Sequence, residues 1–93
     1  MSDQTPTPPS VYDHILFMVE QISAVSWQKL GLQHDTMTGQ LAQNLPEAKV
    51  AIDTTAYLVS VIEGQLDEDD RRRINGMVRD LRINYVQKNT EVG

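Results

Sequence analysis

The side chains that could bind a metal or support catalysis are few. The chain has two histidines, His14 and His34, and no cysteine. Metal-ligand pairs on a helix stand three or four positions apart, and the residue four positions after His14 is Met18, which is not a ligand for hard metals. His34 is followed directly by Asp35, but adjacent side chains diverge. We therefore expect no metal site and no cofactor. We expect both histidines to be surface or partly packed residues.

No pattern typical of an enzyme is present. The sequence has no glycine-rich phosphate loop and no nucleophile elbow. The acidic run from Asp67 to Asp70 stands at the start of a predicted helix, where acidic side chains face the positive end of the helix dipole. Helix capping thus explains this run without general acid or base chemistry. We expect a protein that is not an enzyme and has no catalytic residues.

The one charged feature with a defined shape lies in the C-terminal third. Four arginines fall within an arc of about 100° on a helical wheel, and such a face could contact phosphate. Against this, Glu68 projects onto the same side, no aromatic residues alternate with the arginines as in single-strand binders, and the net charge is −5. We expect a solvated face and keep nucleic-acid contact as the alternative. The arginines are Arg71, Arg72, Arg79 and Arg82.

Hydrophobic periodicity predicts an all-α protein, a three-helix bundle with up-and-down connections. No segment alternates as a strand would. Ninety-three residues allow one domain, and the proline-rich start and the polar end do not belong to it. The expected parts are a disordered tail at 1–9, one domain at 10–87 with helices at about 10–30, 45–63 and 68–87, and a frayed tail at 88–93.

Capping residues mark the helix ends. Ser10, Asn44 and Asp67 are typical N-caps, and the first two are followed three positions later by Asp13 and Glu47, as in a capping box. Gly31 and Gly64 suit the left-handed position that ends a helix. Between the first two helices, residues 31–44 form a long connection with a turn at 36–39. We expect its apolar side chains, Leu32, Met37 and Leu41, to fold back on the helices.

Two of the helices carry more apolar surface than a small bundle can bury. The apolar arc of residues 10–30 covers about 200°, against a little over 100° for an ordinary surface helix. Helix 45–63 has a second stripe opposite its main face. Either the first helix is central and sandwiched by the other two, or both apolar excesses form a subunit interface. We favour a homodimer, and its expected interface comprises Leu16, Val19, Trp27, Leu30, Val50, Tyr57 and Val61.

Size and charge bound the remaining possibilities. A chain this small rarely supplies more than about 3–5 kcal/mol from its core alone. Without cysteine it has no disulfides, which leaves oligomerisation as the expected source of added stability. The negative charge argues against nucleic acid and anionic membranes as main partners. With no signal-peptide pattern and no apolar run of about 20 residues, we expect a cytoplasmic location.

Several short segments of the chain form a recognisable set: Gly31-Leu32, Thr38-Gly39, Leu45, Ala48, Ile52-Asp53, Gly64-Gln65-Leu66, Leu81-Arg82 and Tyr85-Val86. Their order and spacing resemble a bacterial family of small uncharacterised helical proteins, domain of unknown function 1844. The match spans most of residues 11–87. The resemblance implies a compact all-helical fold and brings no catalytic residues. One departure is Asp67, where the family pattern has threonine; both residues can cap a helix.

The expected function is therefore that of a self-associating interaction or scaffold module, whose partners are a second copy and an unknown protein. A nucleic-acid accessory module is the alternative. A small-molecule sensor with an apolar pocket lined by Trp27 and Tyr57 ranks lowest, because no polar groups converge there.

Overall fold

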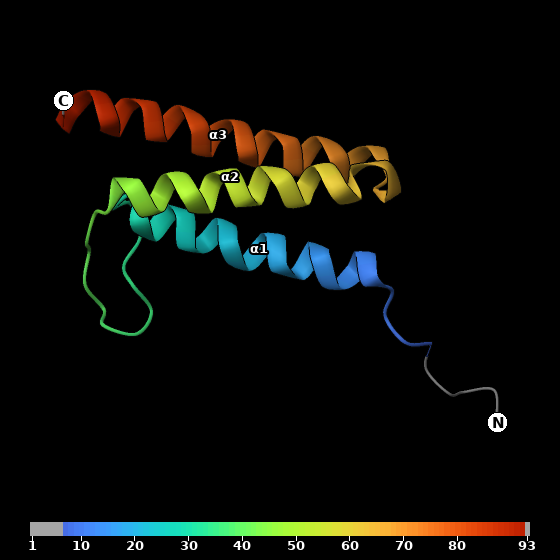
Figure 1. Cartoon of the computed structure of the whole chain (residues 1–93). Coiled ribbons are helices and arrows are strands. Elements are labelled where there is room, and N and C mark those ends of the chain that lie inside the picture. Colours follow the sequence, from blue (N-terminus) through green and yellow to red (C-terminus); the bar gives the residue numbers. More distant parts are fainter. Residues whose placement is uncertain (1–6, 93) are drawn as a thin grey trace.

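The computed structural model describes residues 7–92, which form an all-α, compact fold of three helices without strands in that range. The α-helices are α1 (Val11–Lys29), α2 (Leu45–Ile62) and α3 (Glu68–Val92), and a short 3₁₀ helix, η2 (Glu63–Gln65), links the last two. Consecutive helices run in opposite directions, and a long loop extends from the α1–α2 end (Figure 1). The predicted three-helix architecture is confirmed.

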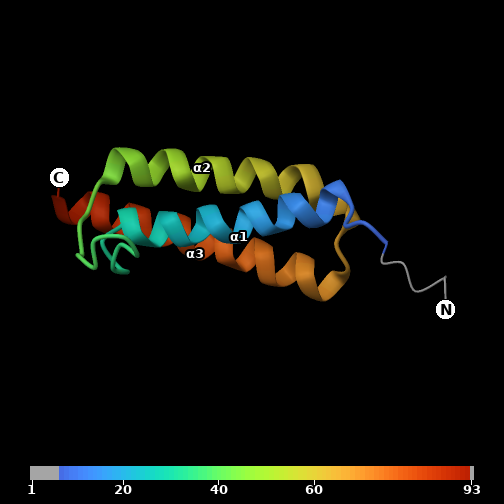
Figure 2. The ribbon, with the colours of Figure 1, turned by 90° about the horizontal axis from the view of Figure 1, so that it is seen from below.

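The central helix of the bundle is α2, not α1. Helix α2 packs against both neighbours, whereas α1 and α3 contact each other much less. Seen from below in Figure 2, α2 lies at one side, and α1 and α3 overlap in the view. A direct link between the outer helices is the ion pair of Arg73 with Glu20, at 3.7 Å. The alternative of a first helix sandwiched by the other two is therefore excluded, and within residues 7–92 one side of α1 has no helix beside it.

The core consists of two clusters along the bundle axis. One joins α1, the C-terminal half of α2 and the first half of α3. The other joins the end of α1, the start of α2 and the middle of α3. Met77 packs against both and makes the core continuous. The fully or nearly fully buried apolar members are Val19, Val59, Ile62, Ile74 and Val78 in the first cluster and Leu30, Ala48, Ile52 and Leu81 in the second.

Small buried side chains allow α1 and α2 to approach closely. Ser23, Ser26 and Thr55 are buried, as are Ala48 and Ala51. Each of the three hydroxyls donates a hydrogen bond to a backbone carbonyl of its own helix, at 2.7 to 2.9 Å. Burying these hydroxyls is inexpensive because their hydrogen bonds are made locally. The hydrophobic pattern did not place the three residues in the core, since it treats serine and threonine as polar.

The predicted N-caps of α1 and α3 are confirmed. The Ser10 hydroxyl accepts from the Asp13 N–H, and the Asp13 carboxylate accepts from the Ser10 N–H, which is the expected capping box. At α3, the Asp67 carboxylate accepts from the Asp70 N–H at 2.8 Å. The acidic run at the start of this helix thus has a structural role.

The start of α2 is tied to the end of α1 rather than closed by a capping box. The Asn44 side chain accepts from the Glu47 N–H as predicted. The Asn44 N–H, however, donates to the Lys29 carbonyl at 2.7 Å, and the Glu47 carboxylate pairs with the Lys29 ammonium at 3.0 Å. The predicted reciprocal bond from Glu47 is replaced by two links between helices.

The two glycines expected to end helices behave differently. Gly31 has φ of 81°, the left-handed conformation predicted for it. Gly64 lies inside η2 and is not among the glycines with positive φ, so this expectation is wrong. The Leu66 N–H donates to the Glu63 carbonyl instead. The Arg71 guanidinium donates to the Glu63 and Leu66 carbonyls, at 3.3 and 3.0 Å, and so ties the first turn of α3 to the end of α2 and to the link between the two helices.

The helical region reaches further toward the C-terminus than predicted. Helix α3 continues to Val92, where an end near residue 87 and a frayed tail at 88–93 were expected. An ion pair between Lys88 and Glu91, one turn apart at 3.5 Å, supports the added turn. At the other end, residues 7–10 are exposed and outside any helix. Residues 1–6 of the expected N-terminal tail lie outside the described residues.

The connection between α1 and α2 closes on itself instead of folding back on the helices. The Asp35 carboxylate accepts from the N–H groups of Met37 and Thr38, and the Asp35 backbone pairs with Gly39 and Gln40. These two hydrogen bonds to the carboxylate lower the pKa of Asp35 from its usual 3.8. Leu32 and Leu41 are exposed and Met37 is 93% exposed, which corrects the expectation that these side chains cover the bundle.

Candidate functional site

The helix α1 half of the predicted dimer surface faces into the chain. Val19 and Leu30 are fully buried in the core clusters, which removes them from any surface of the folded chain. Leu16 and Trp27 are half-buried and pack against those clusters. These four residues form one half of the apolar arc of α1, and this half is covered by the other helices of the same chain.

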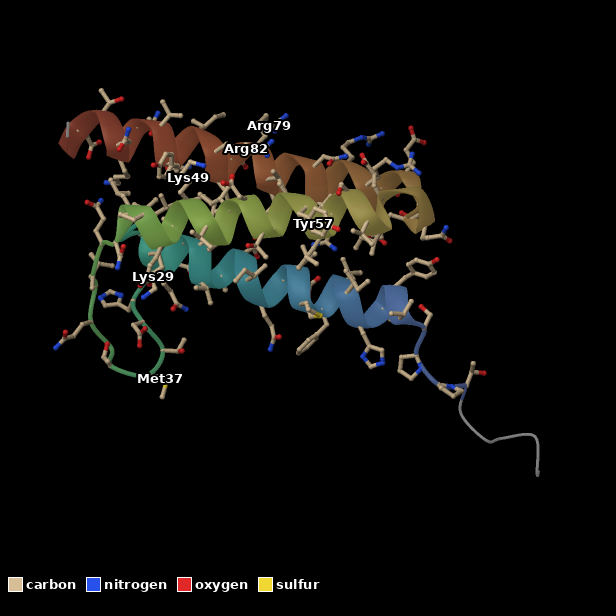
Figure 3. The ribbon with its side chains drawn as sticks, viewed as in Figure 1. Lys29, Met37, Lys49, Tyr57, Arg79 and Arg82 are labelled. Atoms are coloured by element: carbon tan, nitrogen blue, oxygen red, sulfur yellow. The ribbon has the colours of Figure 1, made fainter. Side chains whose placement is uncertain are left out.

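The α2 half of the predicted surface is open. Val50, Tyr57 and Val61 are 66%, 68% and 45% exposed, and Tyr57 lies in the C-terminal half of α2 (Figure 3). Spacings of seven and four residues place all three on one side of the helix. Along this side, toward α1, run two adjoining shallow hollows of about 260 and 310 Å³.

The wall of these hollows on α1 is the other half of its apolar arc. Met18 is 48% exposed and Ile22 and Val25 are half-buried, and all three line the hollows. We call the surface they form with the α2 stripe the α1–α2 face. Its members are Met18, Gln21, Ile22 and Val25 on α1, and Val50, Thr54, Tyr57, Leu58 and Val61 on α2.

Charge is nearly absent from the α1–α2 face. Among the residues that line its two hollows, only Lys29 and Glu47 are charged, and they neutralise each other in an ion pair at one end. Depletion of charge together with exposed tyrosine and methionine is typical of the centre of a protein–protein interface. The sequence showed both apolar halves of α1 but held no signal to say which half α3 would cover.

The four arginines of the predicted basic face do not act as one surface. Arg71 is half-buried and holds the end of α2. Arg72 pairs with Glu68 and Asp69, and Arg79 lies 3.7 Å from Asp80. Within residues 7–92, Arg82 makes no ion pair. Two of the four arginines are thus offset by acidic neighbours, and a third stabilises the end of α2.

Arg82 belongs to a separate hollow of about 230 Å³ between α2 and α3. Lys49, on the α2 side, pairs with Asp53 at 2.8 Å, and this hydrogen bond raises the pKa of the lysine. Figure 3 shows Lys49 and Arg82 along the junction of the two helices. We call this the α2–α3 hollow. It is lined by Lys49, Ile52, Asp53, Arg82, Tyr85 and Val86.

The remaining candidate residues are not brought together. Trp27 packs against the core while Tyr57 is exposed on α2, and neither lines the hollows described above. His14 and His34 are exposed. In the described part of the chain, no three histidine, aspartate or glutamate side chains gather as metal ligands would. No helix in residues 7–92 has both the length and the apolar character needed to cross a membrane.

The fold and these surfaces define a small three-helix protein with an exposed apolar face. A family model described as "Domain of unknown function (DUF1844)" matches residues 12–87, and the chain belongs to this family. The resemblance seen in the sequence is thereby confirmed. Neither the curated proteins nor the solved structures contain a match.

Proposed function

We propose that this chain is a non-enzymatic interaction module that self-associates as a homodimer through the α1–α2 face. The observation that carries the proposal is the α1–α2 face itself, a strip of exposed and half-buried, mostly apolar side chains whose one charged pair, Lys29 and Glu47, lies at its end. Two-fold interfaces use the same patch on both subunits, so the patch must be complementary to itself. A neutral apolar face meets this condition without opposing like charges.

The geometry supports a specific assembly. Helices α1 and α2 are antiparallel, and α3 packs mainly on α2 away from this face. Two copies joined face to face would place four helices around a shared core, with one α3 outside on each subunit. Four-helix cores of this kind bury apolar stripes at ordinary helix-packing angles. The scaffold role follows from the dimer, because each subunit leaves its α3 side free for another protein.

Sedimentation equilibrium at micromolar concentration tests the proposal. We expect a species of 21 kDa, twice the chain mass of 10.5 kDa. Val50→Glu, which places a charge on the α1–α2 face, should raise the dimer dissociation constant at least about hundredfold, because the interface would bury the new carboxylate without a partner.

The matched control is Val86→Glu. Val86 is also a helical valine with similar exposure, 61% against 66% for Val50, but it lies on α3 away from the α1–α2 face. This variant should sediment as the wild type does. A monomeric wild-type protein, or equal dissociation constants for the two variants, would contradict the proposal.

A further inference from the structure

A second concave surface lies on the other side of α2, where the proposed dimer does not reach. The α2–α3 hollow has a floor of Ile52, which is buried, and Tyr85, which is half-buried. Val86 stands exposed at its rim on α3. The surface that the hollow offers is mostly apolar, with charged groups at its edges.

The charges at these edges leave a local positive excess. Lys49 and Asp53 neutralise each other on the α2 side. On the α3 side, Arg82 has no ion-pair partner within residues 7–92, and Arg79 is offset by Asp80. One uncompensated cation beside an apolar floor is notable in a chain of net charge −5. The α1–α2 face, by contrast, has no uncompensated charge.

We propose that the α2–α3 hollow binds a peptide segment of a partner protein in which an acidic residue stands next to a bulky apolar one. The apolar side chain lies on Ile52 and Tyr85, and the carboxylate pairs with the Arg82 guanidinium. Arginine suits this task because its planar fork donates two parallel hydrogen bonds to one carboxylate. The apolar contact supplies affinity and the ion pair supplies orientation.

The same features favour a peptide over nucleic acid. A phosphate backbone seeks several cations in a row, but here Lys49 and Arg79 are neutralised by Asp53 and Asp80, and Arg82 alone remains uncompensated, which suffices for one carboxylate. Single-stranded nucleic acid also needs exposed aromatic rings for its bases, whereas the one ring in the hollow, that of Tyr85, is half-buried. An apolar side chain of a peptide needs only an apolar floor, which Ile52 and Tyr85 supply.

Fluorescence anisotropy of the full chain with labelled probes tests this inference. The first probe is a short fluorescein-labelled peptide in which glutamate alternates with leucine and phenylalanine. Matched peptides replace every glutamate with glutamine, or every leucine and phenylalanine with alanine. A labelled oligothymidylate is the nucleic-acid probe. We expect saturable binding of the first peptide alone, weakening as salt is raised because the ion pair is exposed to solvent.

Arg82→Gln should weaken peptide binding about tenfold, and Arg82→Lys by less, since lysine keeps the charge but not the fork. The control is Arg72→Gln: Arg72 is also exposed on α3 but pairs with Glu68 and lies outside the hollow, so binding should change less than about twofold. No binding of the acidic peptide, or an equal loss in both variants, would overturn the inference. Binding of oligothymidylate that depends on Arg82, without peptide binding, would assign the hollow to nucleic acid instead.

The result of the peptide-binding test can be distinguished from the result of the dimer test. Arg82 lines neither hollow of the α1–α2 face, so Arg82→Gln should sediment as wild type does. A monomeric chain that still binds the peptide through Arg82 would refute the proposed function and leave this inference standing.

Discussion

Replacing Arg71 with glutamine should destabilise the fold, although the residue belongs to a row of arginines that resembles a binding surface. Its guanidinium donates to the Glu63 carbonyl at 3.3 Å and to the Leu66 carbonyl at 3.0 Å, where α2 ends without a left-handed glycine. The glutamine side chain is two bonds shorter and uncharged, so it does not reach the positions of the terminal guanidinium nitrogens and both charge-assisted hydrogen bonds are lost.

The expected loss is about 2 kcal/mol in the free energy of unfolding. A hydrogen bond to a charged group contributes roughly 1.5–3 kcal/mol when the acceptor stays buried after the donor is lost. Glu63 and Leu66 are half-buried rather than buried, so leaving their carbonyls without this donor carries only part of the full penalty, and about 1 kcal/mol for each bond is the appropriate figure. For a domain of this size the melting temperature should fall by roughly 8 to 16 °C.

Urea unfolding followed by far-ultraviolet circular dichroism measures the change, at one fixed protein concentration because self-association adds to apparent stability. The control is Arg72→Gln, which breaks only exposed ion pairs with Glu68 and Asp69 and should cost less than about 0.5 kcal/mol. If the two variants unfold with the same free energy, Arg71 does not hold the end of α2 and the reasoning fails.

Three further predictions concern the loop and the glycines. Gly31→Ala should cost about 1–2 kcal/mol in urea unfolding, since a side chain at φ of 81° is strained and its Cβ would come within 3.2 Å of Gln43; an unchanged midpoint would contradict this. Gly76→Ala should instead raise stability by about 0.5–1 kcal/mol, because its Cβ would meet only the Arg79 side chain at an ordinary 3.6 Å; a loss would show hidden close packing. NMR titration of Asp35 should give a pKa below 3.8, so its contribution to loop stability is complete above pH 3.8 and is lost as the pH falls through the lowered value. Asp35→Asn should remove this pH dependence, and persistence of the dependence would assign it to another group.

Local signals in the sequence predicted most of the secondary structure. Ser10, Asn44 and Asp67 are N-caps as expected, because a capping side chain acts within its own helical turn. The exceptions involve partners distant in sequence. Glu47 pairs with Lys29 across two helices, and the end of α2 is held by Arg71, eight residues after Glu63. Short-range patterns carry no information about such links.

The candidate surfaces were predicted in part, for the same reason. Periodicity showed that α1 has too wide an apolar arc and that α2 has a second stripe, and Val50, Tyr57 and Val61 are indeed exposed. Which half of α1 is covered depends on where α3 lies, and this is a tertiary property. The prediction that Val19 and Leu30 belong to the interface is wrong for this reason, since both lie in the half that is covered. The α2–α3 hollow was not foreseen, because Lys49 and Arg82 stand 33 positions apart.

The two contacts that join the end of α1 to the start of α2 have a practical consequence for engineering. The Lys29 carbonyl and ammonium hold Asn44 and Glu47, so α1 and α2 are joined independently of the residues between them. Closing a longer loop costs little, about 0.6 kcal/mol for each doubling of its length. The exposed turn around Met37 is therefore a suitable place to graft an epitope or a split-reporter fragment. Such an insertion would leave both the α1–α2 face and the α2–α3 hollow intact, and the chain could then report its own assembly in a living cell.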